Sequence, residues 1–265
     1  MMSIFVMGDI HGAARALEQC LERSGFDRRT DTLIQLGDVV DGFDEVYETV
    51  EQLLDIDNLI AIKGNHDDWF FEFIQSGYHP AQWSWGAIST ARSYLRKIGK
   101  EKLVKPVGSG FKVALNPADI PERHQAFFRR QHLYYIDDNN RCFVHGGFNR
   151  HQPFRGQRPE LYYWDRDLWV EALNWLAEKI IHHETSPFEM ATDFDAIFIG
   201  HTSTLKWKTT VPMRAANIYN LDTGAGHHGR LTIMNVETKK FWQSDPVNEI
   251  YGKSPARISM TDAAL

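Results

Sequence analysis

Short apolar runs alternate with polar turns and with longer stretches of helical spacing over the first 80 residues. Runs at 4–7, 32–36 and 59–62 each lead within two residues into a glycine and a group of polar side chains. Stretches at 13–24 and 44–54 follow the first two runs, and a further helical stretch follows the third. Three units of strand, polar turn and helix in succession predict an α/β fold with parallel strands.

The first two predicted helices each have one apolar face. In 13–24, apolar residues recur every three or four positions, at Ala13, Ala16, Leu17, Cys20 and Leu21. In 44–54, the same spacing gives an apolar face made of Val46, Val50, Leu53 and Leu54. A single apolar face is typical of a helix that covers one side of a sheet.

The middle of the chain, from about 78 to 131, differs in composition and is rich in tryptophan, arginine and lysine. Helical spacing appears at 82–97 and 122–131, and the segment 105–121 between them contains several glycines and prolines. We interpret 78–131 as a helical insertion that caps one side of the core.

The second half returns to apolar runs. Runs at 142–144 and 196–199 are separated by a predicted helix at about 166–181, and three strands are expected between 217 and 243, closing a second sheet. The predicted fold class is therefore α/β, with a two-sheet β-sandwich core flanked by helices and the helical cap insertion. At 265 residues and 43% apolar content, a single domain over 1–265 is expected.

Charge and cysteine content narrow the possible partners. Lysine and arginine number 29 against 35 aspartates and glutamates, a net charge of -6, which argues against nucleic acid as a partner. The start of the chain lacks the basic region of a signal peptide, and no apolar run approaches the roughly 18 residues of a membrane span. Cys20 and Cys142 make no disulfide framework, so we expect a reduced, cytoplasmic setting without a membrane partner.

Six short motifs carry the candidate chemistry. They are GDIHG at 8–12, GDVVD at 37–41, GNHD at 64–67, HGG at 145–147, GHT at 200–202 and DTG at 222–224. The first five each place a metal-ligating side chain beside a glycine, and four of these five follow an apolar run. Ligands in open α/β sheets gather at the carboxyl ends of strands. The residues expected to converge there are Asp9, Asp38, Asn65, His145 and His201.

Any one of these motifs alone is more typical of a turn or of a structural histidine, but all of them in this order favour a metal site. Carboxylate, imidazole and amide ligands without thiolate suit manganese, with iron or zinc as alternatives. Five or six ligands exceed what one catalytic ion with an open position uses. We therefore expect two divalent metal ions, bridged by Asp38.

The order of these motifs resembles the calcineurin-like metallophosphoesterase superfamily, specifically its phosphoprotein-phosphatase-type branch. Further stretches are similar to small prokaryotic members of that branch, which include serine/threonine phosphatases and diadenosine tetraphosphatases. These stretches are WSWGAISTARSY at 83–94, PERHQAFFRRQHLYY at 121–135, WDRDLW at 164–169 and NLDTGAGHHGRLT at 220–232. The resemblance therefore spans nearly the whole chain.

The resemblance implies a role for each matching position. The metal ligands that it implies are Asp9 and His11 for the first ion, Asp38 as the bridge, and Asn65, His145 and His201 for the second. A hydroxide bridging the ions would attack phosphorus, and Asn65 and Arg166 would bind the substrate. It further implies that His66 is the general acid and that Asp41 orients its ring.

One position departs from the family pattern. Members usually read GDxxDRG, with the arginine on the phosphate, but Gly42 stands at the arginine position. Arg15, Lys63 and Arg150 are near strand-end loops and are the candidate replacements, although each also fits a solvated surface residue.

The function expected from all this is a phosphomonoesterase of the serine/threonine protein phosphatase type, acting on phosphorylated protein or a small phosphoester. The first alternative is a dinucleoside polyphosphate hydrolase. The second is a catalytically silent binding scaffold.

Overall fold

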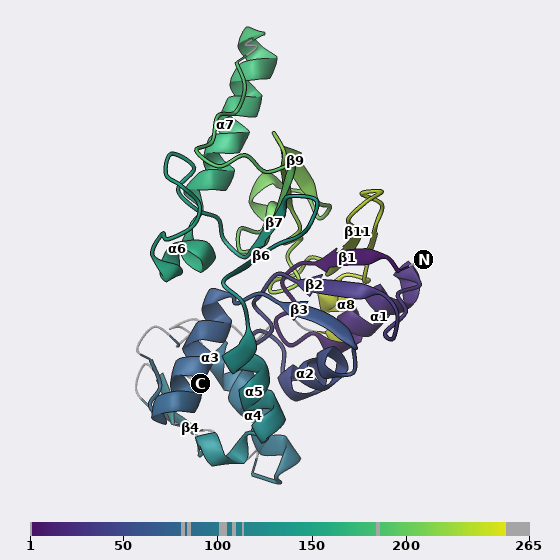
Figure 1. Cartoon of the computed structure of the whole chain (residues 1–265). Coiled ribbons are helices and arrows are strands. Elements are labelled where there is room, and N and C mark those ends of the chain that lie inside the picture. The colour runs from purple at the N-terminus through teal and green to yellow at the C-terminus, as the bar shows by residue number, and fades with distance from the viewer. Residues whose placement is uncertain are drawn as a thin grey trace.

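The structure is a computed structural model, and it describes residues 2–80, 83, 86–100, 105–107, 110–112, 114–183 and 186–252. Two five-stranded mixed sheets lie at its centre (Figure 1). The first has the order β12-β11-β1-β2-β3, with β1 (Ile4–Met7), β2 (Thr32–Gln35), β3 (Asn58–Ala61), β11 (Thr232–Asn235) and β12 (Phe241–Gln243). The second has the order β6-β7-β8-β10-β9, with β6 (Tyr134–Ile136), β7 (Arg141–Val144), β8 (Ala196–Ile199), β9 (Met213–Ala215) and β10 (Ile218–Asn220).

The predicted strand-turn-helix units are confirmed. β1, β2 and β3 are parallel neighbours, with Ile4 opposite Thr32 and Thr32 opposite Asn58. The helices α1 (Ala14–Ser24) and α2 (Val46–Leu54) follow β1 and β2 and bury the expected apolar faces. The prediction for Leu54 was wrong, because its side chain is 39% exposed at the last position of α2.

The expectation that three C-terminal strands close the second sheet was also wrong. The three strands exist, but only β10 joins that sheet, where it pairs in parallel with β8. β11 instead pairs antiparallel with β1, and β12 pairs antiparallel with β11, so both extend the first sheet. Their apolar pattern suits either sheet, and the pairing partner is set by long-range packing.

The two sheets pack face to face and helices cover their outer faces, as the sequence predicted. The inner layer draws buried side chains from both sheets, among them Val6, Ile34, Phe143, Phe198 and Met234. The outer face of the first sheet is covered by α1 and α2, joined by α3 (Asn65–Ser76), α4 (Ala87–Lys97) and α5 (Glu122–Arg130). The second sheet is covered by α6 (Pro159–Trp164) and α7 (Asp167–His182).

The middle segment contains more than the two predicted helices. The described part of 78–131 holds α4 and α5, a short hairpin of β4 (Lys105–Val107) and β5 (Gly110–Lys112), and the 3-10 helix η2 (Pro117–Asp119). The helix predicted at 82–97 begins at Ala87, and Gln82 lies outside the described residues. That this segment is an insertion within a single domain stays a prediction.

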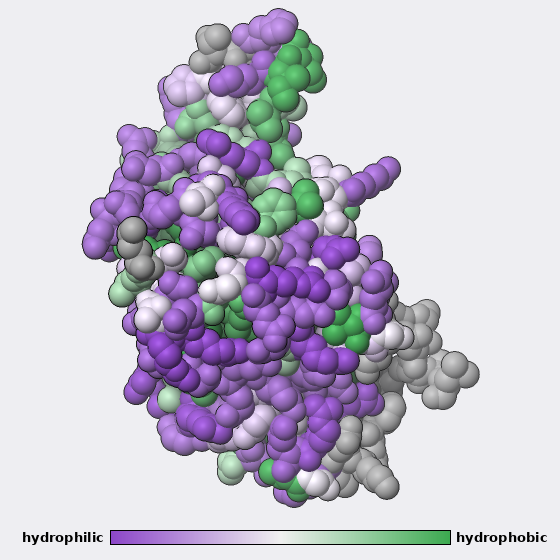
Figure 2. Space-filling model, turned by 90° about the vertical axis from the view of Figure 1, so that its right-hand side faces the viewer, coloured by the Kyte–Doolittle hydropathy of each residue, from purple (hydrophilic) through white to green (hydrophobic). Residues whose placement is uncertain are grey.

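The surface in Figure 2 is mainly hydrophilic, with hydrophobic residues gathered at the upper end, where α7 projects from the second sheet in Figure 1. Ile180 and Ile181 of α7 are 67% and 68% exposed. None of the helices in the described ranges combines the length and apolar character that crossing a bilayer requires. The described ranges also contain two further short elements, η3 (Thr204–Trp207) and α8 (Val247–Tyr251).

Candidate metal centre

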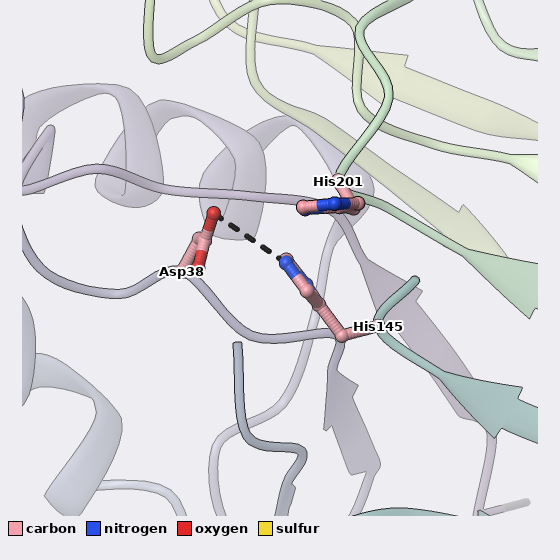
Figure 3. Close-up of side chains that lie close together, drawn as sticks. All are labelled: Asp38, His145 and His201. Atoms are coloured by element: carbon pink, nitrogen blue, oxygen red, sulfur yellow. Dashed lines mark ion pairs between the residues drawn. The ribbon is translucent and has the colours of Figure 1, made fainter. Parts of the chain in front are cut away.

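Side chains from five loops meet where β1, β2, β3, β7 and β8 end, as predicted. Two groups of possible ligands stand out among the described residues: Asp38, His145 and His201 form one, and Asp9, His11 and Asp38 form the other. Within each group, one ligand atom per residue lies within 4.8 Å of the others. Figure 3 shows the first group pointing at a common volume. Asp38 belongs to both groups, so a single carboxylate faces two potential ion positions.

Backbone carbonyls fix which nitrogen of two histidines faces the centre. His145 Nδ1 lies 2.7 Å from Leu36 O, and His11 Nδ1 lies 3.1 Å from Val40 O. A carbonyl oxygen only accepts, so each Nδ1 carries the proton and leaves Nε2 as the ligand atom. His145 Nε2 is 3.4 Å and His11 Nε2 is 3.6 Å from Asp38 Oδ2.

The donor set of the first group fits a cation. His145 Nε2 lies 3.3 Å from Asn65 Oδ1 as well as 3.4 Å from Asp38 Oδ2, so acceptor atoms face one another. Buried acceptor atoms at these distances repel one another unless a proton or a metal ion lies between them. His201 Nε2 is buried and has no hydrogen-bond partner among the described residues, which is costly unless the nitrogen binds an ion. Nitrogen and oxygen donors without thiolate suit a divalent metal.

Buried carboxylates crowd the same volume. Burial, together with the negative charges of Asp222 and Asp38, raises the pKa of Asp9 well above its usual range. Burial also raises the pKa of Asp222 to about 6, and the charge of Asp38 adds to the rise. Burial opposes ionisation of Asp38 too, but its interactions with the neighbouring His145 and His66 rings outweigh burial and hold the pKa of Asp38 well below its usual range. Bound cations would relieve this repulsion.

Burial also keeps two of the candidate ligand histidines neutral, the state that binds metal. Burial lowers the pKa of His11 to about 3, although the charge of Asp38 opposes it. Burial and the neighbouring His145 lower the pKa of His201 well below its usual range. Neutral imidazole is the ligand form, so these side chains are ready to bind an ion at neutral pH.

The backbone is bent to bring the ligands together. His11, Asp38 and His201 have φ values of 53°, 55° and 65°, in the left-handed region that few non-glycine residues adopt. Neighbouring glycines make room: a Cβ at Gly64 would lie 2.1 Å from Asp38 Oδ1, and a Cβ at Gly200 would lie 2.1 Å from Asp9 Oδ1. Gly64 and Gly200 therefore permit the close approach of the Asp38 and Asp9 carboxylates.

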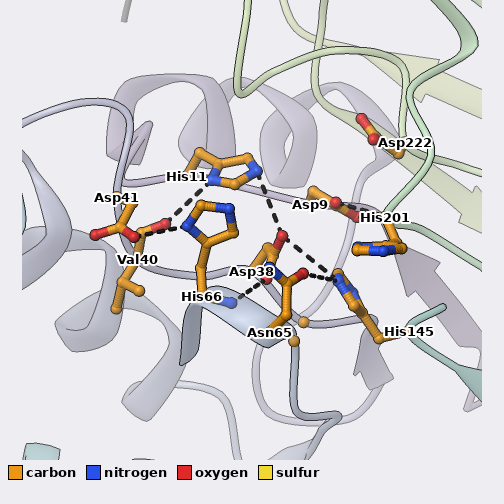
Figure 4. A network of polar contacts seen from close by, with 12 residues as sticks. Asp9, His11, Asp38, Val40, Asp41, Asn65, His66, His145, His201 and Asp222 are labelled. Atoms are coloured by element: carbon orange, nitrogen blue, oxygen red, sulfur yellow. Dashed lines mark hydrogen bonds and ion pairs between the residues drawn. The ribbon is translucent and has the colours of Figure 1, made fainter. Parts of the chain in front are cut away.

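His66 and Asp41 form a hydrogen-bonded pair beside the ligands, as expected. His66 Nδ1 donates to Asp41 Oδ2 over 2.7 Å, and the backbone N–H of His66 donates to Asp38 Oδ1 over 3.0 Å. Burial opposes the charge on the His66 ring, but Asp38 and the hydrogen bond to Asp41 outweigh it and raise the pKa to about 9. Figure 4 shows the pair next to His11.

A cavity of about 370 Å³ opens over these residues. Arg166 and Lys206 line it, and Arg166 Nη1 donates to His201 O and Thr202 Oγ1 over 2.8 Å each. Trp69 and Trp164 also line it, with ring centroids 5.3 Å apart. Arg166 was expected from the sequence; Lys206, on η3, was not.

The three cations proposed to replace the missing arginine point elsewhere. Arg15 pairs with Glu45, Lys63 with Asp68 and Arg150 with Glu171, and none of the three lines the cavity.

The local backbone explains the glycine at position 42. Gly42 has a φ of 81°, and a Cβ there would lie 2.8 Å from the backbone oxygen and 2.9 Å from the Cβ of His11. A side chain at position 42 would therefore push against a candidate metal ligand, and an arginine does not fit without movement of the His11 loop.

Asp222 was identified in a motif, but no role was assigned to it. Its carboxylate lies next to Asp9 and His201 in Figure 4 and lines the cavity. The only signal in the sequence was its position directly after a strand, β10, which is the same position that the other ligands occupy.

Comparison with known proteins agrees with the motif order. The family model described as "Calcineurin-like phosphoesterase" matches residues 2–204. The chain is 23% identical to "Serine/threonine-protein phosphatase 1" of Salmonella typhimurium, over 88% of this chain and 92% of that protein. It is 24% identical to the symmetrical bis(5'-nucleosyl)-tetraphosphatase of Neisseria meningitidis, over 96% of this chain and 99% of that protein.

Two further matches are more limited. The symmetrical bis(5'-nucleosyl)-tetraphosphatase of Pseudomonas fluorescens is 37% identical to this chain over 67 residues. That match covers 25% of this chain and 24% of the length of that protein. The solved structure of a candidate diadenosine tetraphosphatase superposes with a TM-score of 0.59 and 15% identity, covering 91% of this chain and 92% of that one. That structural likeness concerns the fold alone.

Proposed function

The chain belongs to the calcineurin-like phosphoesterase family, and from this premise we propose that it is a phosphohydrolase that depends on two divalent metal ions. The observation that carries the proposal is the single carboxylate of Asp38, shared by two groups of ligand atoms that each converge within 4.8 Å. We propose a phosphomonoesterase of the serine/threonine protein phosphatase type, acting on phosphoserine or phosphothreonine in protein and on small aryl phosphates.

The two groups of ligand atoms support the proposed ligand roles. Asp9 and His11 would hold one ion and Asp38 would bind both. Asn65, His145 and His201 would hold the other. Bound divalent ions supply Lewis-acid activation of water and charge stabilisation for the phosphoryl group. Manganese is the proposed metal, with iron or zinc as alternatives, because the donors are oxygen and imidazole nitrogen without sulfur. A reduced cytoplasmic setting fits the two buried free cysteines, Cys20 and Cys142.

His66 is the proposed general acid. Its Nδ1 is held by Asp41 over 2.7 Å, and the ring lines the cavity. The nitrogen that is not bonded to Asp41 points into the space enclosed by the labelled residues in Figure 4. A proton delivered from there to the leaving oxygen contributes about 10²–10⁴-fold to the rate of a poor leaving group.

Arg166 and Lys206 are the proposed phosphate-binding cations. Arg166 is fixed by two neutral acceptors, His201 O and Thr202 Oγ1, so its charge stays available to an anion. Lys206 is exposed, lines the same cavity and makes no ion pair within the described part of the chain. Arg166 and Lys206 line one cavity of about 370 Å³, so both side chains can act on one bound ligand.

A second candidate function is hydrolysis of a dinucleoside polyphosphate. Trp69 and Trp164 line the cavity beside the ligands, and Trp164 is 41% exposed, so a nucleobase has an aromatic surface to stack on. Two cations beside the metal ligands also suit a chain of phosphates.

Parallel assays separate the two candidates. We would measure kcat/KM of the manganese-loaded protein for a phosphothreonine peptide, p-nitrophenyl phosphate and diadenosine tetraphosphate. Turnover of the peptide at comparable or higher efficiency supports the first proposal, and a large preference for the dinucleotide overturns it in favour of the second. No hydrolysis of any of the three, with two ions bound, would support a binding scaffold instead.

A further inference from the structure

The carboxylate of Asp41 is enclosed by hydrogen-bond donors. Its Oδ1 accepts from the Thr90 hydroxyl over 2.6 Å and from the Trp83 indole N–H over 3.1 Å. Its Oδ2 accepts from His66 Nδ1 over 2.7 Å and lies 3.1 Å from the same indole nitrogen. Asp41 is only 1% exposed, so these side chains replace water around the carboxylate. Its plane is therefore fixed by three partners.

Two of these donors come from a part of the chain that holds no candidate ligand. Thr90 lies in the first turn of α4, and Trp83 lies just before that helix; they are 0% and 1% exposed. Between them, Gly86 has a φ of 79°, and a Cβ at that position would lie 2.4 Å from Asp41 Cβ. The start of α4 is therefore shaped to wrap closely around Asp41.

Thr90 holds Asp41 at two points. Its hydroxyl donates its one proton to Asp41 Oδ1 and accepts from the backbone N–H of Asp41 over 3.0 Å. The side chain and the backbone of Asp41 are thus tied to the same oxygen. A carboxylate held in this way cannot turn away from His66, and a hydrogen bond of fixed direction sets the plane of the imidazole.

We propose that Thr90 and Trp83 are positioning residues for the acid step, holding Asp41 so that His66 presents its other ring nitrogen to the leaving oxygen. The inference rests on the proposed acid role of His66. Neither residue lines the cavity, so neither is expected to touch substrate. The effect of removing either donor should therefore depend on how much protonation the leaving group needs.

The same contacts have a purely structural alternative, in which Thr90 only anchors α4 to the loop after β2. That role predicts loss of stability and an equal loss of activity on every substrate. A positioning role predicts a selective loss on poor leaving groups, because p-nitrophenolate departs without a proton and an alkoxide does not. The leaving-group dependence therefore separates the two.

The test uses Thr90→Val, which keeps the size and removes the hydroxyl, and Thr90→Ser, which keeps the hydroxyl. Ser93→Ala is the matched control, because Ser93 is a buried hydroxyl on the same helix that accepts from Tyr47 N over 2.8 Å and does not reach Asp41. The full-length, manganese-loaded variants are assayed with a phosphoserine peptide and with p-nitrophenyl phosphate, and their metal content is measured.

We expect Thr90→Val to lower kcat on the peptide by about 10- to 100-fold, and on p-nitrophenyl phosphate by less than about threefold, with metal content unchanged. Thr90→Ser should restore most of the peptide activity, and Ser93→Ala should affect both substrates equally. Equal losses on both substrates, or no loss on the peptide, would overturn the inference.

Two further variants keep the test decisive. If Thr90→Val does not fold, Trp83→Phe removes the indole N–H and keeps an aromatic ring against Phe70 and Phe73, and the same selective loss is expected. His66→Asn tests the proposed function itself. If His66→Asn shows no leaving-group dependence, the acid role fails; if it does and the Thr90 and Trp83 variants do not, only the positioning role fails.

Discussion

Replacing Asp38 by asparagine should separate the metal-dependent part of the protein's stability from the rest. Asp38 is the only residue common to the two ligand groups found among the described residues. In the wild type, the backbone N–H of His66 donates to Asp38 Oδ1 over 3.0 Å. The side-chain amide of Asp38→Asn has an oxygen that can accept the same hydrogen bond, so the loop after β2 keeps this contact. What the variant loses is the negative charge that faces both ion positions.

The expected magnitude follows from binding linkage. Each ion present at 100 times its dissociation constant stabilises the folded state by about 2.7 kcal/mol, so two ions contribute about 5 kcal/mol. For a chain of this size, each kcal/mol raises Tm by about 2–4 °C, so manganese should raise the wild-type Tm by about 10–20 °C. Without metal, the variant should melt below the wild type, because the pKa of Asp38 is held well below its usual range by His145 and His66 and this attraction is lost with the charge. The repulsion that the charge of Asp38 exerts on Asp9 and Asp222 is lost as well and offsets part of that difference.

The assay is calorimetric unfolding of both proteins in chelator and in excess manganese, with metal content measured on the same samples. We expect the manganese-induced rise in Tm to fall below about 5 °C in Asp38→Asn, because both sites lose their shared ligand. Asp68→Asn is the control and should keep the full rise, because Asp68 lies on α3, pairs with Lys63 and belongs to neither ligand group. Two bound ions and an unchanged rise in Asp38→Asn would refute the bridging role.

Three further predictions concern the acid and the phosphate-binding cations. His66→Asn should lower kcat on an alkyl phosphate by about 100-fold or more and on p-nitrophenyl phosphate by less than about tenfold; equal losses would count against the acid role. Lys206→Met should raise the inhibition constant for inorganic phosphate about fivefold, whereas Lys208→Met, an equal change of charge outside the cavity lining, should not; identical constants for the two variants would exclude Lys206 from phosphate binding. The raised pKa of His66, about 9 against an ordinary 6.5, contributes stability to the metal-free protein that is fully present below pH 6.5 and is lost as pH rises through 9. Urea unfolding in chelator should therefore show the stability difference between wild type and His66→Asn shrinking over that range, and a difference that grows with pH would have the wrong sign.

Much of the site was predictable because its chemistry is local to strand ends. A glycine and a polar ligand directly after an apolar run mark the carboxyl end of a strand, and parallel strands bring such ends to one edge. This pattern predicts from the sequence that Asp9, Asp38, Asn65, His145 and His201 converge, and in the structure they lie together. The resemblance to the family then supplied roles for His11, His66, Asp41 and Arg166, which spacing alone does not assign.

The remainder depends on contacts that no local pattern encodes. β11 pairs with β1 across more than 220 residues of sequence, and its short apolar run is equally consistent with the other sheet. Thr90 reaches Asp41 over a separation of 49 residues, and a threonine in a helix usually has no such role. Lys206 was missed because η3 turns it toward a cavity whose walls come from distant segments.

The most direct test of the two-ion centre is anomalous diffraction from a crystal of the manganese-loaded protein, recorded on both sides of the manganese absorption edge. Two anomalous peaks are expected, one between Asp9 and His11 and the other among Asn65, His145 and His201, with the Asp38 carboxylate in contact with both. A single peak, or two peaks that do not share Asp38, would contradict the account.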